Sequence, residues 1–296
     1  MRKWLLCVLT AAGLLRPAPV LAWGADGHRL IMRRAIALLP PELKPFFEKY
    51  ADEVVVRVID PDTWRNVGWP DDPNHFMDFG AREYGAYPFT DLPRDYGRAL
   101  EKFGQVVIDR NGRLPWRLGE VFGQLRRSFE GFPRQSPYVI SDVVLFSAVA
   151  SHYLQDAHQP FHATDDYDGV KAGQRGIHAR FERDLIERYA DTLVIAPPPM
   201  VPMKTPADHV WDVLLTSHTL VDQVLAADKA AAEGRELYDA VYYDRFFEKA
   251  RPVLERRLSD AVTATAALIT GAWIEAGRPA VVLDPPRPVQ KIDRGK

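Results

Sequence analysis

Cysteine is almost absent from this chain. The only one, Cys7, lies within the first 22 of the 296 residues. A disulfide framework and a zinc site built from thiolates are therefore excluded for the rest of the sequence. An excess of one charge is also lacking, because 38 basic and 40 acidic residues leave a formal charge of -2. A dedicated duplex-binding protein normally carries a strong basic excess, so any contact with nucleic acid must come from a local site.

Long apolar runs are missing too. The apolar stretch near the start, from Trp4 to Leu15, has 12 residues, whereas a transmembrane helix needs about 20. It follows a basic start and precedes Val20-Leu21-Ala22, which resembles a signal-peptidase site. We expect residues 1–22 to be a signal peptide and the mature chain to begin at Trp23, in the periplasm or outside the cell. A buried first helix is the alternative.

No long alternation of apolar and polar residues predicts a sheet. Apolar residues at helical spacing predict helices over 28–39, from Ser141-Asp142 to 159, from Thr205-Pro206 to about 225, and from Pro252 onward. The β-branched stretch 54–59 fits either a short strand or a buried helix segment. The sequence therefore predicts an all-α fold, with a single compact multi-helix domain over 23–276.

Turn-forming residues mark the connections. Segments 60–92 and 163–176 are rich in Pro, Asp, Gly or Asn and are predicted to be ordered loops, and 196–202 is predicted to be a connector. Loops of such length in a compact domain are more often functional than idle. Residues 277–296 contain four prolines and many charges, which predicts a poorly ordered tail.

Histidine is concentrated in one segment, because four of the eight histidines lie between 152 and 178. His152 and Asp156 are four residues apart, so they share one face of a helix, and His178 and Glu182 repeat this spacing. His162 follows Pro160, which is predicted to end the helix, so a loop can turn the His162 side chain back toward His152 and Asp156. Imidazole and carboxylate groups both bind zinc, so the spacing favours a metal site over two ion pairs on a helix surface.

The segment 152–162, HYLQDAHQPFH, resembles a motif shared by bacterial zinc-dependent phospholipases C and the single-strand-specific zinc nucleases of fungi, plants and bacteria. WGADGH at 23–28, DTWR at 62–65 and HFMD at 75–78 extend the resemblance in the same order. Beyond about residue 190 the chain matches only as generic helix. Both groups are all-helical and carry three zinc ions, so the resemblance implies this fold and this cofactor here.

Three zinc sites are implied by the resemblance, with these residues as ligands. The first would be held by Asp62, His75, His152 and Asp156, the second by His162, His178 and Glu182, and the third by Trp23, His28 and Asp156. Asp156 would bridge two ions. Trp23 would bind through its amino group and carbonyl, which requires cleavage after Ala22.

Several neighbouring residues leave alternatives open. Asp62 is favoured by the position of Arg65 three residues later, but Asp60, Asp71 and Asp72 lie close by in the sequence. Arg65 could grip a phosphate through two hydrogen bonds or pair with a carboxylate. Three histidines are not expected to be ligands: His158 falls off the face shared by His152 and Asp156, and His209 and His218 lie on other predicted helix positions.

The resemblance implies a phosphodiesterase in which Asp62 and Asp156 serve catalysis around a metal-activated water. A nuclease acting on single-stranded DNA or RNA is expected, with no stable protein partner. Aromatic rings near His75 could stack on bases or simply pack within their loop; they are Phe76, Phe79, Tyr84 and Tyr87.

Other functions remain as alternatives. A phospholipase C is favoured by Glu182, whereas Asp72-Pro-Asn lacks the aromatic residue that this group has before its counterpart of His75. A cytosolic His-Asp phosphohydrolase would need an adjacent His-Asp pair, which the sequence does not contain. A non-catalytic zinc-binding protein is the third alternative.

Overall fold

The structure is a computed structural model that describes residues 23–284. This part of the chain is all-helical and contains no strand, which confirms the predicted fold class. None of its helices is both long and apolar enough to cross a membrane. The predicted signal peptide and residues 285–296 of the predicted tail lie outside the described residues.

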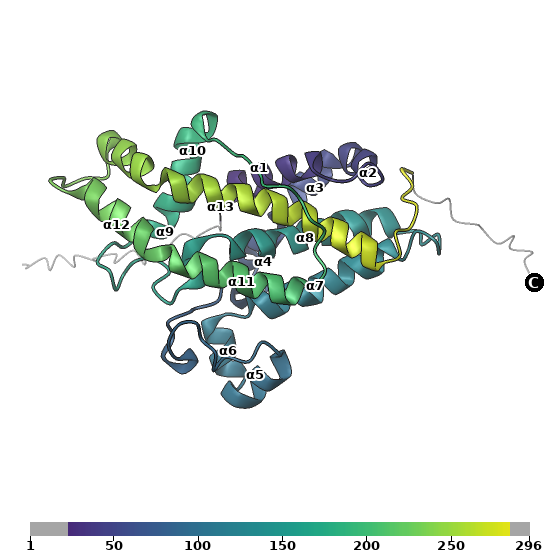
Figure 1. Cartoon of the computed structure of the whole chain (residues 1–296), viewed down its shortest axis with the longest axis horizontal. Helices are drawn as coiled ribbons and strands as arrows, with labels where there is room; N and C mark the ends of the chain where they lie inside the picture. The colour runs from purple at the N-terminus through teal and green to yellow at the C-terminus, as the bar shows by residue number, and fades with distance from the viewer. Residues whose placement is uncertain (1–22, 285–296) are drawn as a thin grey trace, which may run out of the picture.

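Helix α8, Val139–Ala157, lies at the centre of the fold and is buried on nearly all sides. Such a helix must be covered by others, because it has no polar face for solvent. It packs against α7 (Leu114–Phe129), α13 (Ala240–Glu275) and α11 (Pro206–Thr219), which run along it in Figure 1. The helices share one hydrophobic core and form a single compact domain.

The N-terminal helices cover another side of α8 and α13. They are α1 (Gly24–Ala37), α2 (Lys44–Lys49) and α3 (Ala51–Arg57). Helix α1 confirms the helix predicted over 28–39 but begins four residues earlier. The ambiguous stretch 54–59 falls largely in α3, where Val54 and Val55 are buried and Val56 is 59% exposed. Two adjacent buried valines fit one face of a helix, not the alternation of a strand.

The prediction that 60–92 is entirely loop was wrong, because α4 spans Asp60–Asn66. Pro61 occupies its first turn, where a missing backbone N–H costs nothing. Asp60 and Asp62 lie in the same turn, where the helix dipole favours negative charge. The segment continues with two short 3-10 helices, η1 (Asp72–Asn74) and η2 (Arg82–Tyr84).

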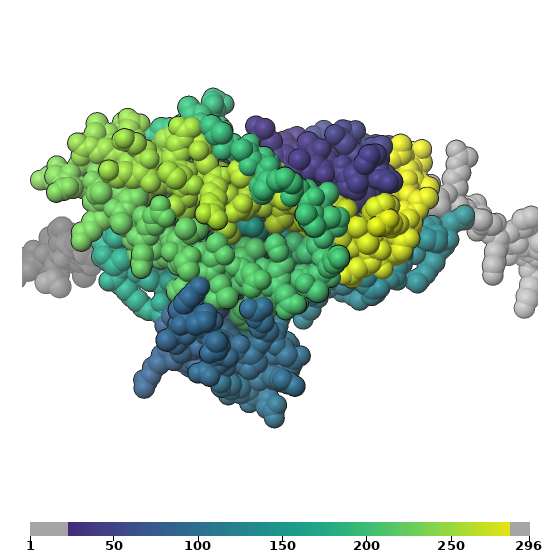
Figure 2. All heavy atoms as spheres, viewed as in Figure 1, coloured from purple at the N-terminus to yellow at the C-terminus, as the bar shows by residue number. Residues whose placement is uncertain are grey.

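Two small helices follow as a protruding lobe. Figure 2 shows α5 (Tyr96–Phe103) and α6 (Gln105–Asn111) standing out from one side of the molecule.

Helix boundaries also differ from the predictions in α8, α11 and α13. Helix α8 starts two residues before Ser141, whose hydroxyl donates to the carbonyl of Tyr138 instead of capping the helix. The helix predicted from Thr205-Pro206 begins there but breaks at Leu220, and α12 (Val221–Ala232) follows. Helix α13 begins at Ala240 and contains Pro252. Burial of aromatic residues before Pro252 outweighs the hydrogen bond that proline removes.

The second predicted loop, 163–176, is irregular as expected. It connects η3 (Pro160–Ala163) to a helical stretch made of α9 (Ile177–Ala179), the π-helical turn η4 (Arg180–Asp184) and α10 (Leu185–Tyr189). After η5 (Ala190–Thr192), residues 193–205 form the expected connector, and the Met203 amide donates to Ala267 of α13. The segment after η5 is therefore held against α13.

The described start of the predicted tail, residues 277–284, contacts the N-terminal helices. Lys49 and Tyr50 both donate hydrogen bonds to the carbonyl of Leu283.

The connector that contains Met203 packs closely on α13 at Gly271, and substitution of this glycine tests the contact. A methyl group added at Gly271 would lie 2.1 Å from the carbonyl oxygen of Met203, whereas one added at Gly119 of α7 would meet nothing within 4 Å. We expect Gly271→Ala to destabilise the protein by about 1–3 kcal/mol, although alanine is otherwise the better helix former. Gly119→Ala is the matched control and should raise stability by up to about 1 kcal/mol. Urea unfolding of both variants measures this, and equal stabilisation would contradict the packing.

Candidate metal centre

Three groups of buried side chains offer ligand atoms to a metal ion. Within each group the atoms lie within 4.8 Å of one another. The groups are Asp62, His75 and His152 (group one); His162, His178 and Glu182 (group two); and His28, His152 and Asp156 (group three). The structure thus brings together eight of the nine ligands that the sequence resemblance implied, from five parts of the chain.

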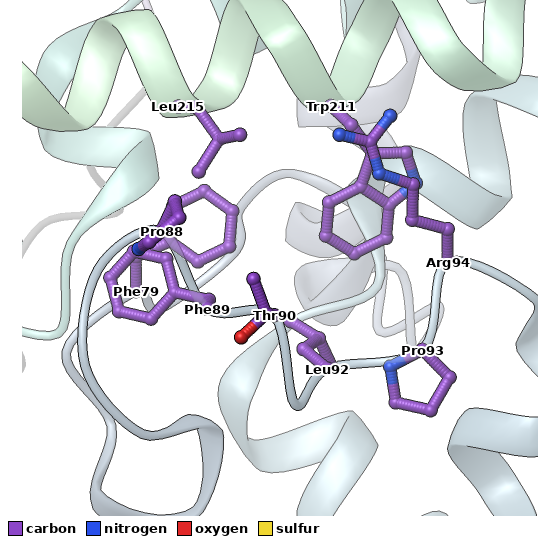
Figure 3. Close-up of a pocket in the computed structure, with 9 residues that line it drawn as sticks. All are labelled: Phe79, Pro88, Phe89, Thr90, Leu92, Pro93, Arg94, Trp211 and Leu215. Carbon is purple, nitrogen blue, oxygen red and sulfur yellow. The ribbon is translucent and has the colours of Figure 1, made fainter.

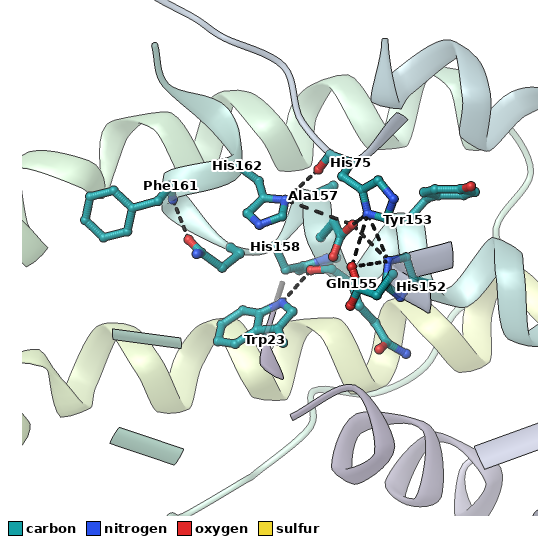
Figure 4. Close-up of polar contacts among 12 residues, drawn as sticks. Trp23, His75, His152, Tyr153, Gln155, Ala157, His158, Phe161 and His162 are labelled. Atoms are coloured by element: carbon teal, nitrogen blue, oxygen red, sulfur yellow. Dashed lines mark hydrogen bonds and ion pairs between the residues drawn. The ribbon is translucent and has the colours of Figure 1, made fainter. Parts of the chain in front are cut away.

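The fold converges these residues on the C-terminal half of α8. His152 and Asp156 share one face of α8, as their spacing predicts, and their side chains approach within 3.3 Å. His162 follows in η3 and turns back, so that its Nδ1 lies 4.0 Å from Asp156. Figure 4 shows the imidazoles of His75, His152 and His162 pointing toward one another across this helix end.

The Asp156 carboxylate faces two groups at once. Its Oδ1 lies 3.3 Å from His28 Nε2, and its Oδ2 lies 3.0 Å from His75 Nδ1 and 3.3 Å from His152 Nε2. The side chain is fully buried. A buried carboxylate between imidazoles from two groups has the geometry of a bridging ligand.

Hydrogen bonds from outside the groups orient four of the five histidines. His28 Nδ1 bonds Gln155, His152 Nδ1 bonds the carbonyl of Val58, and His162 Nδ1 bonds the carbonyl of His75. A carbonyl only accepts, so each of these Nδ1 atoms carries the proton. The Nε2 lone pairs then point into the groups. Such outer hydrogen bonds accompany almost every metal-binding histidine.

His75 is oriented by Asp71. Its Nε2 lies 3.0 Å from Asp71 Oδ2, which also accepts from Tyr153 at 2.8 Å. Of the four aspartates between 60 and 72, Asp62 is therefore the one placed inside a group, and Asp71 acts from behind His75. Asp60 and Asp72 instead face Arg57 and Arg65 nearer the surface.

Buried polar atoms without a hydrogen bond concentrate in these groups. They include His28 Nε2, Asp62 Oδ2, Asp156 Oδ1, His162 Nε2, both nitrogens of His178, and Glu182 Oε1. Buried polar groups are normally satisfied, so a cluster of unsatisfied lone pairs calls for a further partner. Imidazole nitrogens and carboxylate oxygens in sets of three or four fit a divalent cation such as zinc.

The pKa values of the histidines around Asp156 differ in direction. Burial lowers the pKa of His75, but hydrogen bonds to Asp156 and Asp71 outweigh it and raise the pKa to about 9. His28 is also raised, because Asp156 outweighs its burial. Burial lowers the pKa of His162 to about 4 and also lowers that of His152. His75 therefore holds a proton at neutral pH, whereas His162 is neutral and presents a free lone pair.

In group two, Glu182 lies in the π-helical turn η4 and His178 lies in α9 just before it. His178 Nε2 lies 2.9 Å from Glu182 Oε2, so the predicted shared face is present. Gln159, at the end of α8, donates to the same carboxylate oxygen at 2.7 Å. π-helical turns are rare and often occur at functional sites.

Trp23 lies at the start of α1 and is fully buried. Its indole donates to the carbonyl of Gln155 at 2.6 Å, which Figure 4 shows, and its backbone nitrogen lies 3.1 Å from Glu182 Oε2. The nitrogen that the resemblance implied as a ligand is therefore inside the centre, beside group two.

The two residues predicted to bind substrate differ in their surroundings. Arg65 pairs with carboxylates, through Nη2 with Asp62 and through Nη1 with Asp72 at 3.5 Å, as the second alternative proposed. Phe76 is partly buried, and its ring contacts the backbone at Gly112.

The other aromatic residues near His75 mostly pack within the fold. Tyr84 and Phe79 are fully buried, and Phe79 stacks on Phe89 at 4.5 Å between ring centres. Both phenylalanines line a cavity of about 390 Å³ together with Trp211, shown in Figure 3, which none of the predicted ligands lines. Packing within the loop is thus the better interpretation for Phe79 and Tyr84.

The three histidines not expected to be ligands lie outside all three groups. His158 bonds the carbonyl of Leu154, and His218 bonds that of Ala163.

Sequence reasoning missed the supporting residues. Gln155 and Gln159 lie in the same short motif as the ligands, and their four-residue spacing could have indicated a shared role. Tyr167, which is 53% exposed and lies 6.3 Å from the His178 ring, sits in the loop between two ligands. Asp71 gave no signal that distinguished it from its neighbours.

Comparison with known proteins does not assign the chain to a family. No protein-family model matches the chain, and no curated protein matches it.

Protons must leave when a metal ion binds here. His75, with a pKa of about 9, is protonated at pH 7 and must release its Nδ1 proton to a cation. We expect zinc added to the metal-free protein at pH 7 to release protons, and its affinity to fall as the pH is lowered. The release from His75 should disappear as the pH rises through about 9. Calorimetry in two buffers of different ionisation enthalpy measures this, and heats that are the same in both would contradict it.

Proposed function

We propose that the chain is an exported, zinc-dependent phosphodiesterase that hydrolyses single-stranded DNA or RNA. The observation that carries the proposal is Asp156, whose two oxygens face imidazoles of groups one and three. A closed structural zinc site uses four ligands around one ion and needs no bridging carboxylate. The motifs between 23 and 182 support the same assignment, because they resemble those of the zinc phospholipases C and single-strand nucleases.

The proposed ligands are those of the resemblance. Zinc would be held by Asp62, His75, His152 and Asp156, by His162, His178 and Glu182, and by Trp23, His28 and Asp156. When bound, zinc would supply an acidified water and stabilise negative charge on the phosphate.

The chain's own groups would then orient the reaction. Asp62 Oδ2 has no hydrogen bond, so it is free to accept one from an attacking water. Arg65 donates to the other oxygen of Asp62 and thereby fixes the direction of the carboxylate. Asp156, whose two oxygens face His28 and His75, would fix the positions of groups one and three relative to each other. Burial of all three groups excludes bulk water, which strengthens each electrostatic contact.

Nucleic acid is favoured as the substrate by one contact. The exposed Tyr167 ring borders His178, and an accessible aromatic ring beside the centre suits stacking on a base. Phe76 could contribute in the same way from the loop after His75. The net charge of -2 fits a local recognition of this kind better than broad electrostatic binding.

A phospholipase C is the second candidate. Glu182 matches that group in the resemblance, and exposed rings such as Trp69, 62% exposed, could contact lipid. The same metal centre would serve, because both substrates are phosphate diesters.

Zinc counting and activity test the proposal together. Purified protein beginning at Trp23 should bind about three zinc ions and cleave single-stranded DNA and RNA faster than phospholipid vesicles. His178→Ala should lose one ion and lower the rate on the order of 100-fold, since charge stabilisation of that size is typical. His209→Ala, outside the three groups, is the control and should retain both. One zinc per chain with no hydrolysis would favour a structural role, and cleavage of phospholipid alone would favour the second candidate.

Export processing can be tested separately. The Trp23 nitrogen lies 3.1 Å from Glu182, and an extra residue before it would turn the proposed amine ligand into a peptide nitrogen, which has no lone pair to offer a metal ion. We expect protein extended by one glycine to bind one zinc ion fewer and to lose activity. Protein extended at Lys296 is the control. Unchanged metal content in the N-terminal extension would show that Trp23 is no ligand.

A further inference from the structure

His178 differs from the other histidines of the centre. Each of the other four has one ring nitrogen fixed by a hydrogen bond to a neighbouring group, whereas neither nitrogen of His178 has one. The direction of its ring therefore depends on neighbouring rings, such as Phe161, and on the helical stretch that carries it. The residue that holds this stretch in place is Arg180, which lies between His178 and Glu182.

The Arg180 side chain points away from the metal groups and is 6% exposed. Its guanidinium meets Asp228 of α12 through two nitrogens, at 3.1 Å and 3.0 Å, and its Nε donates to the Tyr242 hydroxyl of α13 at 2.9 Å. The ring of Tyr238 covers it at 4.1 Å. One side chain thus attaches the turn to two other helices.

The same guanidinium also holds the end of the loop that precedes His178. It donates to the carbonyls of Arg175 at 2.7 Å and Gln174 at 3.1 Å. Gly176 allows this approach, because an added methyl group there would lie 2.9 Å from the guanidinium. Asp228 completes the contact by accepting from the Gln174 side chain at 2.6 Å.

We propose that the Arg180–Asp228 pair is a positioning device for group two and sets how tightly His162, His178 and Glu182 hold their ion. Arg180 supplies from the opposite face of the helix the orientation that an outer hydrogen bond supplies to the other histidines. Five donors in a planar fork are required, so lysine cannot replace arginine here. This inference rests on the proposed metal binding, and neither residue touches the ion or the substrate.

Metal binding by matched variants tests the proposal. Arg180→Lys keeps the charge and loses the fork, and we expect one of three zinc ions to bind about 10- to 100-fold more weakly, as is typical when an outer partner is lost. The other two ions should bind as in the unmodified protein. Arg188→Met is the control, because Arg188 of α10 lies 4.0 Å over the Tyr243 ring and so also links this stretch to α13. It should bind all three ions normally.

The identity of the weakened ion follows from a double variant. His178→Ala should lose the ion of group two, so adding Arg180→Lys to it should cause no further loss. Competition with a chelator, followed by zinc counting, measures each affinity. Should Arg180→Lys not fold, Arg180→Met combined with Asp228→Leu replaces the buried ion pair by apolar groups, a change that is often tolerated. The folded pair variant should show the same weakened ion.

The outcomes separate this inference from the proposed function. Fewer than three zinc ions in the unmodified protein would contradict the proposed function itself. Three ions of unchanged affinity in a folded Arg180 variant would overturn only the positioning role. Equal weakening of all three ions, or a further loss in the double variant, would also overturn it.

Discussion

The Asp156 carboxylate, buried without solvent between imidazoles of different helices, is the constraint on which the centre depends. An isolated buried carboxylate is very costly, so it must be compensated by protons on neighbouring histidines or by a cation. The structure meets this need with His75, whose pKa of about 9 places a proton beside the carboxylate when no cation does so, and the carboxylate also raises the pKa of His28. The same arrangement favours a cation that accepts lone pairs from imidazole nitrogens and carboxylate oxygens.

The rest of the fold supports that carboxylate. Residues 147–157 of helix α8 are all buried, so Asp156 lies away from bulk water. Hydrogen bonds at the helix end continue the support: Ser217 donates to the carbonyl of Ala157, and the buried Arg257 donates to that of His158. These carbonyls have no partner within the helix, and a cation near them is also favoured by the helix dipole.

Two kinds of orientation coexist in the centre. Groups one and three are held by short hydrogen bonds from single atoms, such as the Val58 carbonyl behind His152. In group two, hydrogen bonds of the same kind hold His162 and Glu182, whereas we propose that His178 is held through a buried ion pair on the far side of its helical turn. A buried pair is geometrically demanding and contributes specificity more than stability, which suits a ligand set whose spacing depends on a π-helical turn.

The sequence by itself determined the helical class and the residues that could carry metal chemistry. Four-residue spacing is enough to place His152 with Asp156, and His178 with Glu182, because side chains at that spacing share a face in any helix. It could not determine where helices end, as Leu220 and Pro252 show, because local preference is overridden when apolar residues on both sides are buried. Nor could it separate Asp62 from Asp71, two aspartates nine positions apart. Only tertiary structure decided that Asp62 faces the group and Asp71 supports His75, because both roles depend on the direction from which the chain brings each carboxylate to one imidazole.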